Sequence, residues 1–187
     1  MKIEEKEIEG VYEINLNPIE DDRGFFMRSF DKKILAEAGI ANEWVQENHS
    51  LSKQKGTIRG LHFQYPPDTE CKLMRVVTGE LFLAIVDIRK GSKTFGKWTS
   101  IVLSEKTKNL ALIPRGCTNG ICTLTDDVNL LYKVDRYYAK HNEAVISWND
   151  PDLAIDWPIK KPEVISKRDS NGMSFKEFKE KHGGLDI

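Results

Sequence analysis

Short segments of apolar or alternating residues recur along the chain, separated by glycine, proline or aspartate. The segments read VYEINL, GFFMRSF, EWVQENHS, GTIRGLHF, KLMRVV, ELFLAIVDIR, KWTSIVL, NLALIP, NGICTL, VNLLYKV and EAVISW. Between Gly56 and Trp148 no segment has the apolar spacing of an amphipathic helix, which the crossover connections of a parallel sheet would require. The pattern therefore predicts an all-β fold of many antiparallel strands, closed into a barrel or packed as a sandwich.

Two short helices are predicted at the periphery of this sheet structure. One covers residues 31–38, with Asp31 as its N-cap and Gly39 just past its end, and the other covers about 174–182 and stops at Gly183. The loops YPPDTE and NDPDLAIDWP are expected to rim a cavity. Because no linker or repeat interrupts the pattern, we expect residues 1–187 to form a single domain with a helical tail at about 170–187.

The composition refines this picture mainly by exclusion. Lys and Arg number 28 and Asp and Glu number 29, so no field of one sign favours nucleic acid or an anionic membrane as a partner. No apolar run approaches the roughly 18 residues of a membrane span, and the acidic N-terminus is unlike a signal peptide. Three cysteines without C-x-x-C spacing are typical of a protein from the reducing cytoplasm.

The densest group of chemically active residue types lies in GTIRGLHFQYPPDTECK, residues 56–72. It holds Arg59, His62, Gln64 and Lys72, and a histidine in such a group is a candidate general base. In an unbroken strand the period of two would send Arg59 and His62 to opposite faces. We therefore predict a bulge at Gly60 that re-aims one of them. The alternative is that His62 is a hydrogen-bonded histidine of structural importance only.

Several other chemistries are disfavoured by spacing. No metal site is predicted, because no H-x-H or similar ligand pair occurs among His49, His62, His141 and His182. No signature of a nucleophilic thiol surrounds the cysteines, and Cys117 and Cys122 are expected to be buried and inert. The chain also lacks the phosphate-binding glycine loops of nicotinamide-dependent and ATP-dependent proteins.

A collinear series of segments runs from about Asp21 to Asp169: DDRGFFMRSF, VQENHSLSKQKGTIRGLHFQ, KLMRVVTGELFLAIVDIRKGSKTFGKW, LALIPRGCTNG, LLYKV, NDPDLAIDWP and ISKRD. Each segment alone is weakly specific, but the ordered series strongly resembles the dTDP-4-dehydrorhamnose 3,5-epimerase family. The resemblance implies a cupin-type antiparallel β-barrel (jelly roll) and a homodimer that exchanges strands. It also implies catalysis without a metal or an organic cofactor.

The resemblance also implies roles for individual residues. His62 matches the family's general base, Asp169 the carboxylate that pairs with it, and Lys72 the cation beside the C4 oxygen, where charge develops. Tyr132 matches the acid on the opposite face of the sugar ring. The substrate and its pyrophosphate would be held by Arg23, Gln46, Asn48 and Arg59.

Three positions depart from the family pattern. Asn119 stands where the family has a second active-site histidine, and asparagine cannot shuttle a proton near neutral pH. Arg28 replaces an acid and Glu70 replaces a glutamine, both close to where the family places its ligand. We count Arg28 and Asn119 among the substrate-binding residues and favour a retuned site over neutral drift.

The expected function is inversion at C3, C5 or both of a nucleotide-linked 4-keto-6-deoxy-hexose through an enolate. Arg28 and Asn119 favour a different substrate or inversion at a single centre, and Glu70 is a third departure from the pattern. Two further alternatives stay open: a 3,4-ketoisomerase, and a barrel that binds sugar nucleotides without turnover. Taken singly, Tyr132, Lys72 and Asp169 also fit ordinary structural roles.

Overall fold

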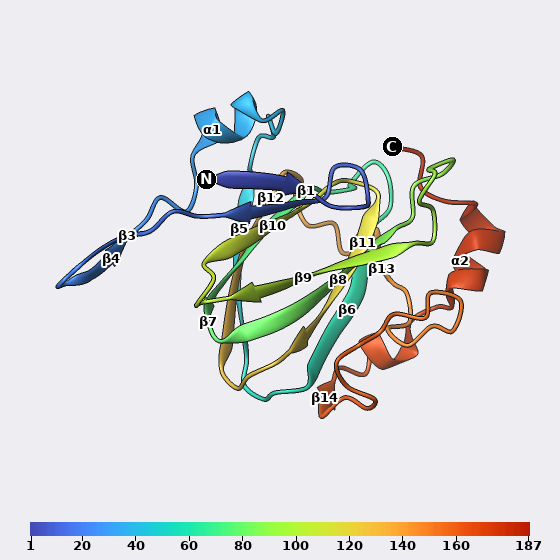
Figure 1. Cartoon of the computed structure of the whole chain (residues 1–187). Coiled ribbons are helices and arrows are strands. Elements are labelled where there is room, and N and C mark those ends of the chain that lie inside the picture. The colour runs from blue at the N-terminus through green and yellow to red at the C-terminus, as the bar shows by residue number, and fades with distance from the viewer.

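The computed structural model describes all 187 residues, and most of its regular elements are short β-strands (Figure 1). The first sheet has the order β1 (Lys2–Glu5), β2 (Tyr12–Asn15), β10 (Asn109–Ile113), β7 (Lys72–Thr78), β12 (Val128–Val134) and β5 (Gln46–Ser52). The second has the order β13 (Glu143–Val145), β6 (Thr57–Gln64), β11 (Cys117–Thr123), β8 (Glu80–Asp87) and β9 (Trp98–Ser104), and β14 (Val164–Ile165) pairs with β6.

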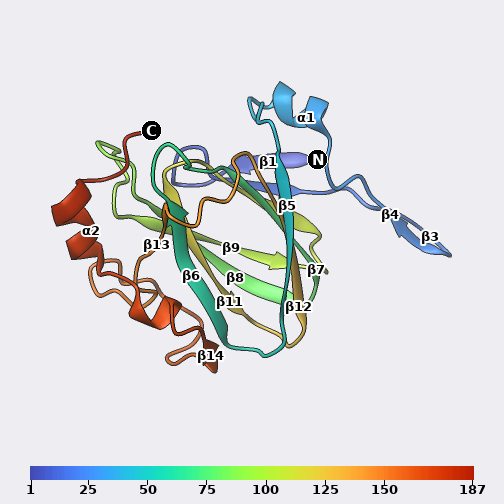
Figure 2. The ribbon, with the colours of Figure 1, turned by 180° about the vertical axis from the view of Figure 1, so that it is seen from behind.

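All pairings between these strands are antiparallel except the short contact of β14 with β6. The two sheets face each other across the molecule (Figures 1 and 2). No helix lies between Gly56 and Trp148. The predicted all-β, antiparallel architecture is therefore confirmed.

The apolar core fills one half of the space between the two sheets. Leu81, Leu83 and Ile85 of β8 pack there against apolar residues of β7 and β10 from the first sheet. Buried apolar area of this kind contributes about 25 cal/mol per Å² to folding. The other half of the space between the sheets is lined by polar side chains and stays hollow, as described below.

Both predicted helices are confirmed. In α1 (Lys32–Glu37) the Asp31 side chain accepts from the backbone N–H groups of Lys33 and Ile34. In α2 (Phe175–His182) Ser174 and Glu177 form a capping box, and Gly183 ends the helix with a positive φ of 64°. Helices of six and eight residues are far shorter than the roughly 20 residues that cross a bilayer.

Three short features have no clear apolar signal in the sequence. They are β1, β14 and a 3₁₀ turn at Asp169–Asn171. The predicted strand GFFMRSF is shorter than expected, since only Gly24–Phe26 (β4) is extended, paired with β3 (Ile19–Asp21). This β3–β4 hairpin projects away from the barrel (Figure 1).

Candidate active site

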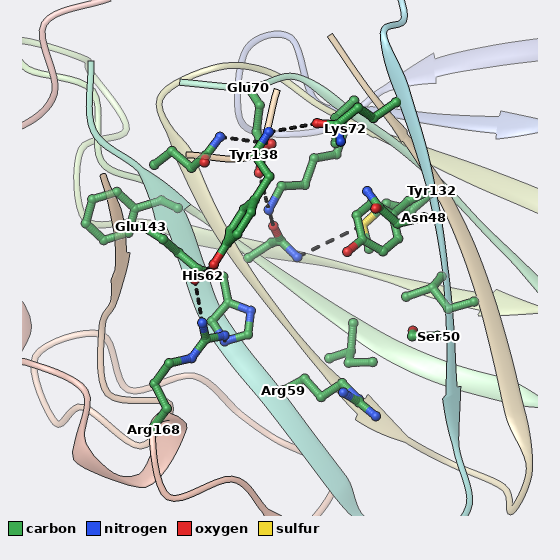
Figure 3. A pocket seen from close by; sticks show the side chains of 18 residues that line it. Asn48, Ser50, Arg59, His62, Glu70, Lys72, Tyr132, Tyr138, Glu143 and Arg168 are labelled. Atoms are coloured by element: carbon green, nitrogen blue, oxygen red, sulfur yellow. Dashed lines mark hydrogen bonds and ion pairs between the residues drawn. The ribbon is translucent and has the colours of Figure 1, made fainter. Parts of the chain in front are cut away.

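A cavity of about 340 Å³ opens between the two sheets, a volume within the usual range for small-ligand sites. Its walls come from β5, β7 and β12 of the first sheet and from β6 and β11 of the second. Figure 3 shows polar side chains from both walls converging on the hollow. Because polar groups rarely gather in a core without a purpose, this cavity is the candidate site.

The bulge predicted at Gly60 is present. The register of β11 and β6 pairs Asn119 with His62 but Ile121 with Arg59, which leaves one extra residue in β6. Gly60 has a φ of 127°, and a Cβ there would lie 2.5 Å from Gly120 Cα. The bulge turns Arg59 and His62 to the same side, so both line the cavity.

His62 is held by a buried carboxylate. Its Nε2 lies 2.8 Å from Oδ1 of Asp169, whose side chain is only 3% exposed. Burial alone would raise the pKa of Asp169, but the hydrogen bond and charge of His62, the Gly60 N–H and Arg168 together hold it at about 2. Because an ionised carboxylate only accepts, the neutral form of His62 carries its proton on Nε2 and its lone pair on Nδ1. That second ring nitrogen faces the cavity (Figure 3).

Lys72 reaches into the cavity from β7 and is almost buried, with 10% of its side chain exposed. Its Nζ lies 3.2 Å from Oε1 of Glu70 and 2.9 Å from Oδ1 of Asn119. The first contact offsets the charge of the ammonium, and the second links the two sheets. A cation fixed in this way can stabilise negative charge on a ligand oxygen.

Tyr132 enters from β12, on the wall opposite His62 (Figure 3). Burial, followed by the nearby carboxylates of Glu70 and Glu143, raises the pKa of its hydroxyl above the ordinary value. The phenol is therefore protonated at neutral pH and can act as an acid. A histidine paired with a carboxylate and a protonated phenol thus face one cavity from different sheets.

The residues predicted to bind substrate fall into two groups. Gln46, Asn48, Arg59 and Asn119 line the cavity, whereas Arg23 and Arg28 lie outside it. Arg23 sits on the exposed β3–β4 hairpin and pairs with Asp21 at 2.6 Å, and Arg28 lies 3.6 Å from Asp31. The cavity of a single chain is therefore assembled without these two arginines.

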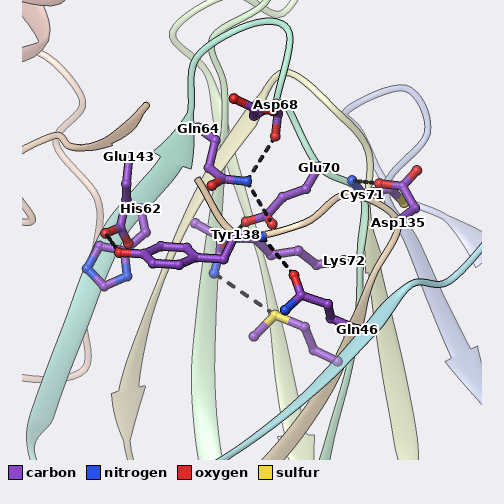
Figure 4. A network of polar contacts seen from close by, with 12 residues as sticks. Gln46, His62, Gln64, Asp68, Glu70, Cys71, Lys72, Asp135, Tyr138 and Glu143 are labelled. Carbon is purple, nitrogen blue, oxygen red and sulfur yellow. Dashed lines mark hydrogen bonds and ion pairs between the residues drawn. The ribbon is translucent and has the colours of Figure 1, made fainter. Parts of the chain in front are cut away.

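Sequence reasoning missed several lining residues, namely Ser50, Tyr138, Glu143 and Arg168. Arg168 pairs with Glu143 and lies 3.1 Å from Nε2 of His62, and the Tyr138 hydroxyl donates to Glu143. Figure 4 shows Tyr138 lying across the site, where its backbone N–H donates to Gln46. Two signals in the sequence could have found some of them. Arg168 directly precedes Asp169, and Ser50 lies two residues after Asn48, on the same face of the strand. Nothing in the sequence marked Tyr138.

All three cysteines are free and buried. Burial raises the pKa of the Cys117 thiol to about 12 and that of the Cys122 thiol to about 11, and it also raises the pKa of Cys71. Such thiols are poor nucleophiles near neutral pH, as expected for Cys117 and Cys122. No group of three or more His, Cys, Asp or Glu side chains has an arrangement suited to a metal ion.

The fold and the cavity define a β-barrel protein with a polar, ligand-sized cavity between its sheets. The family model described as dTDP-4-dehydrorhamnose 3,5-epimerase matches residues 5–177. The chain is 46% identical over 156 residues to the dTDP-4-dehydrorhamnose 3,5-epimerase of Shigella flexneri, covering 83% of this chain and 85% of that protein. The chain therefore belongs to the dTDP-4-dehydrorhamnose 3,5-epimerase family, and it has the family's cupin-type jelly roll.

Solved structures agree with this assignment. The dTDP-4-dehydrorhamnose 3,5-epimerase of Bacillus anthracis, solved with TDP and PPi bound, superposes with a TM-score of 0.90 at 39% identity and covers 92% of this chain and 98% of its own. ChmJ, a 3'-monoepimerase of Streptomyces bikiniensis in complex with dTDP-quinovose, gives a TM-score of 0.88 at 28% identity and covers 97% of this chain and 91% of its own. Similar barrels thus include an enzyme named for inversion at one centre.

Proposed function

We propose that this protein inverts C3, C5 or both of a nucleotide-linked 4-keto-6-deoxy-hexose of the dTDP-4-dehydro-6-deoxy-glucose type. His62 Nδ1 removes the proton from a carbon next to the ketone, and the electron pair of the broken C–H bond moves to the C4 oxygen. Lys72 stabilises the enolate formed there. Tyr132 then returns a proton from the opposite side, which inverts the centre.

One observation carries this proposal: the His62–Asp169 pair and the protonated phenol of Tyr132 enter the same cavity from opposite sheets. Inversion requires a base on one face of the ring and an acid on the other. The ordered carboxylate supports the base by fixing its tautomer and by stabilising the imidazolium that forms. Arg59, Gln46 and Asn48 stand at the same cavity as candidate substrate contacts.

The test is hydrogen exchange with dTDP-4-keto-6-deoxy-glucose in deuterated water, followed by NMR. We expect deuterium at C3, C5 or both with the wild-type protein, and a loss of at least about 100-fold in His62→Asn, the usual scale of a general base. Tyr132→Phe should still exchange a proton but form inverted product slowly. A wild-type protein that binds the nucleotide sugar without exchange is a binding module, and a 3-keto product would indicate a ketoisomerase.

A second candidate is inversion at a single centre or on a different sugar nucleotide. It is favoured by Asn119 and Glu70, because both depart from the family pattern and both line the cavity beside Lys72. Rapid deuterium incorporation at both C3 and C5 of the same substrate would exclude this candidate. Label confined to one position would support it.

We further propose that the chain folds as one domain, works as a homodimer and acts in the cytoplasm. The exposed hairpin that carries Arg23 supports the dimer, since its apolar residues Ile19, Phe25 and Phe26 are 70%, 54% and 67% exposed. Apolar side chains this exposed in one hairpin are typical of a contact surface. In such a dimer Arg23 would reach the cavity of the partner subunit.

A further inference from the structure

The contact between Lys72 and Asn119 fixes the orientation of an amide inside the cavity. Lys72 Nζ lies 2.9 Å from the side-chain oxygen of Asn119, and an ammonium group donates but never accepts. The amide atom that faces Lys72 is therefore the oxygen on chemical grounds. The amide nitrogen points elsewhere, and its nearest partner is the sulfur of Met74 at 4.0 Å.

The amide nitrogen is a buried donor without a strong acceptor in the protein. Asn119 is only 6% exposed and lines the cavity. Its NH₂ group has two N–H donors, whereas a thioether sulfur is a weak acceptor. A buried donor gains most from an acceptor brought by a ligand, because leaving it unsatisfied costs free energy.

The side-chain N–H donor of Asn119 lies next to the proposed reaction centre. Asn119 is the register partner of His62 across β11 and β6, so the amide lies beside the proposed base. Lys72 approaches from the opposite sheet and is held on its other side by Glu70 at 3.2 Å. Two of the three N–H bonds of Lys72 thus meet protein oxygens, and the third is available to a ligand.

We propose that Asn119 is a further catalytic residue, an inference that rests on the function proposed above. Its Nδ2–H donates to the C4 oxygen of the substrate together with Lys72 Nζ. When His62 takes the proton from carbon, the electron pair of that bond moves to the C4 oxygen, which then meets one cation and one neutral donor. An amide stabilises this oxyanion without giving up a proton, whereas a histidine at position 119 would titrate near neutral pH.

Three variants test this inference by kcat and KM measured across the pH range. Asn119→Leu removes the donor, and Asn119→Asp removes it while keeping an oxygen towards Lys72. We expect kcat to fall about 100-fold or more in both, the usual effect of losing one oxyanion donor, with KM changed little. Asn119→His keeps an N–H donor, so we expect it to retain more activity and to add a pH-dependent limb between about pH 5 and 8.

The controls separate this inference from the proposed function and from misfolding. Asn129→Leu, on the outer face of β12, should retain the wild-type kcat, and thermal unfolding should show that all variants are folded. The inference is overturned by a wild-type kcat in Asn119→Leu or in Asn119→Asp, or by an unchanged pH profile in Asn119→His. Absence of substrate hydrogen exchange in the wild-type protein would instead overturn the proposed function and this inference with it.

Discussion

At the scale of single residues, the proposed chemistry depends on which nitrogen of the neutral His62 ring carries the proton. Asp169 decides this, because its carboxylate, whose pKa is lowered to about 2, is ionised at neutral pH and accepts from Nε2. Arg168 lies on the same edge of the ring and pairs with Glu143. The opposite edge of the His62 ring, which carries Nδ1, is therefore accessible to a substrate in the cavity.

Asp169→Asn should therefore disable the base while leaving it in place. An amide can donate to Nε2, which favours the tautomer with the proton on Nδ1 and the lone pair away from the substrate. We expect kcat to fall about 100- to 10,000-fold with KM little changed, by analogy with the loss of an orienting carboxylate in other histidine-dependent enzymes. Steady-state kinetics measure this, with the exposed Asp156→Asn as the control. An unchanged kcat in Asp169→Asn would contradict the assignment of the tautomer.

At the scale of elements, the bulge in β6 is what brings Arg59 and His62 into one cavity. Gly60→Ala should damage it, because the new Cβ would lie 2.5 Å from Gly120 Cα and 2.7 Å from the Asn119 carbonyl oxygen at a φ of 127°. We expect a loss of at least about 2 kcal/mol in the free energy of unfolding, together with loss of activity. Gly39→Ala is the matched control, since Gly39 also has a positive φ but open space around it, and it should cost about 1 kcal/mol. Equal costs in the two variants would mean that the close approach of β6 and β11 is unimportant.

The turn after β8 depends on one buried carboxylate, Asp87. Burial alone would raise its pKa, but hydrogen bonds from Arg89, Ser92 and Thr94 lower it from 3.8 to about 2. Because the folded-state pKa is lowered, the stabilisation is present above pH 4 and is lost as the pH falls towards 2. It amounts to about 2 kcal/mol at neutral pH.

Urea unfolding between pH 2 and 7 tests this account. The wild-type free energy of unfolding should decrease below pH 4, and Asp169, with its similarly lowered pKa, should contribute to the same decrease. Asp87→Asn should be less stable at pH 7 by about 2 kcal/mol and should lose less stability on acidification. The same acid dependence in wild type and variant would be evidence against a role for Asp87.

Regular elements and the bulge could be predicted because their signals are local. Alternating apolar residues marked the strands, Asp31 and Ser174 marked the helix starts, and the spacing of Arg59 and His62 required an irregularity at Gly60. Tyr138, Glu143 and Arg168 reach the cavity through irregular segments or long-range pairing, so no periodicity could place them. The meeting of Lys72 and Asn119 depends on the closure of two sheets, which no local pattern specifies.

At the scale of the whole molecule, the cavity of one barrel holds the residues of the proposed acid–base site, whereas two arginines predicted to bind substrate, Arg23 and Arg28, lie outside it. Arg23 has 90% of its side chain exposed, on a hairpin whose apolar residues are also exposed. A hairpin held away from its own barrel is available to a second copy, and in a symmetric dimer each copy would give and receive one. The proposed homodimer thus accounts both for the exposed apolar residues and for the position of Arg23.

Mixed dimers can decide whether the hairpin serves the partner's cavity. Arg23→Ala has a complete barrel but a defective hairpin, whereas His62→Asn has a defective barrel but a complete hairpin. Each homodimer should have at most about a tenth of the wild-type activity, because a guanidinium contact to phosphate and a general base each contribute at least that much. A mixed dimer, purified through two different affinity tags, contains one cavity in which the His62 base and the Arg23 hairpin are both intact. If the hairpin crosses between subunits, this dimer should have about half of the wild-type activity, since one of its two sites is whole. If each hairpin serves its own barrel, both sites of the mixed dimer remain defective, and its activity should stay at the mean of the two inactive homodimers.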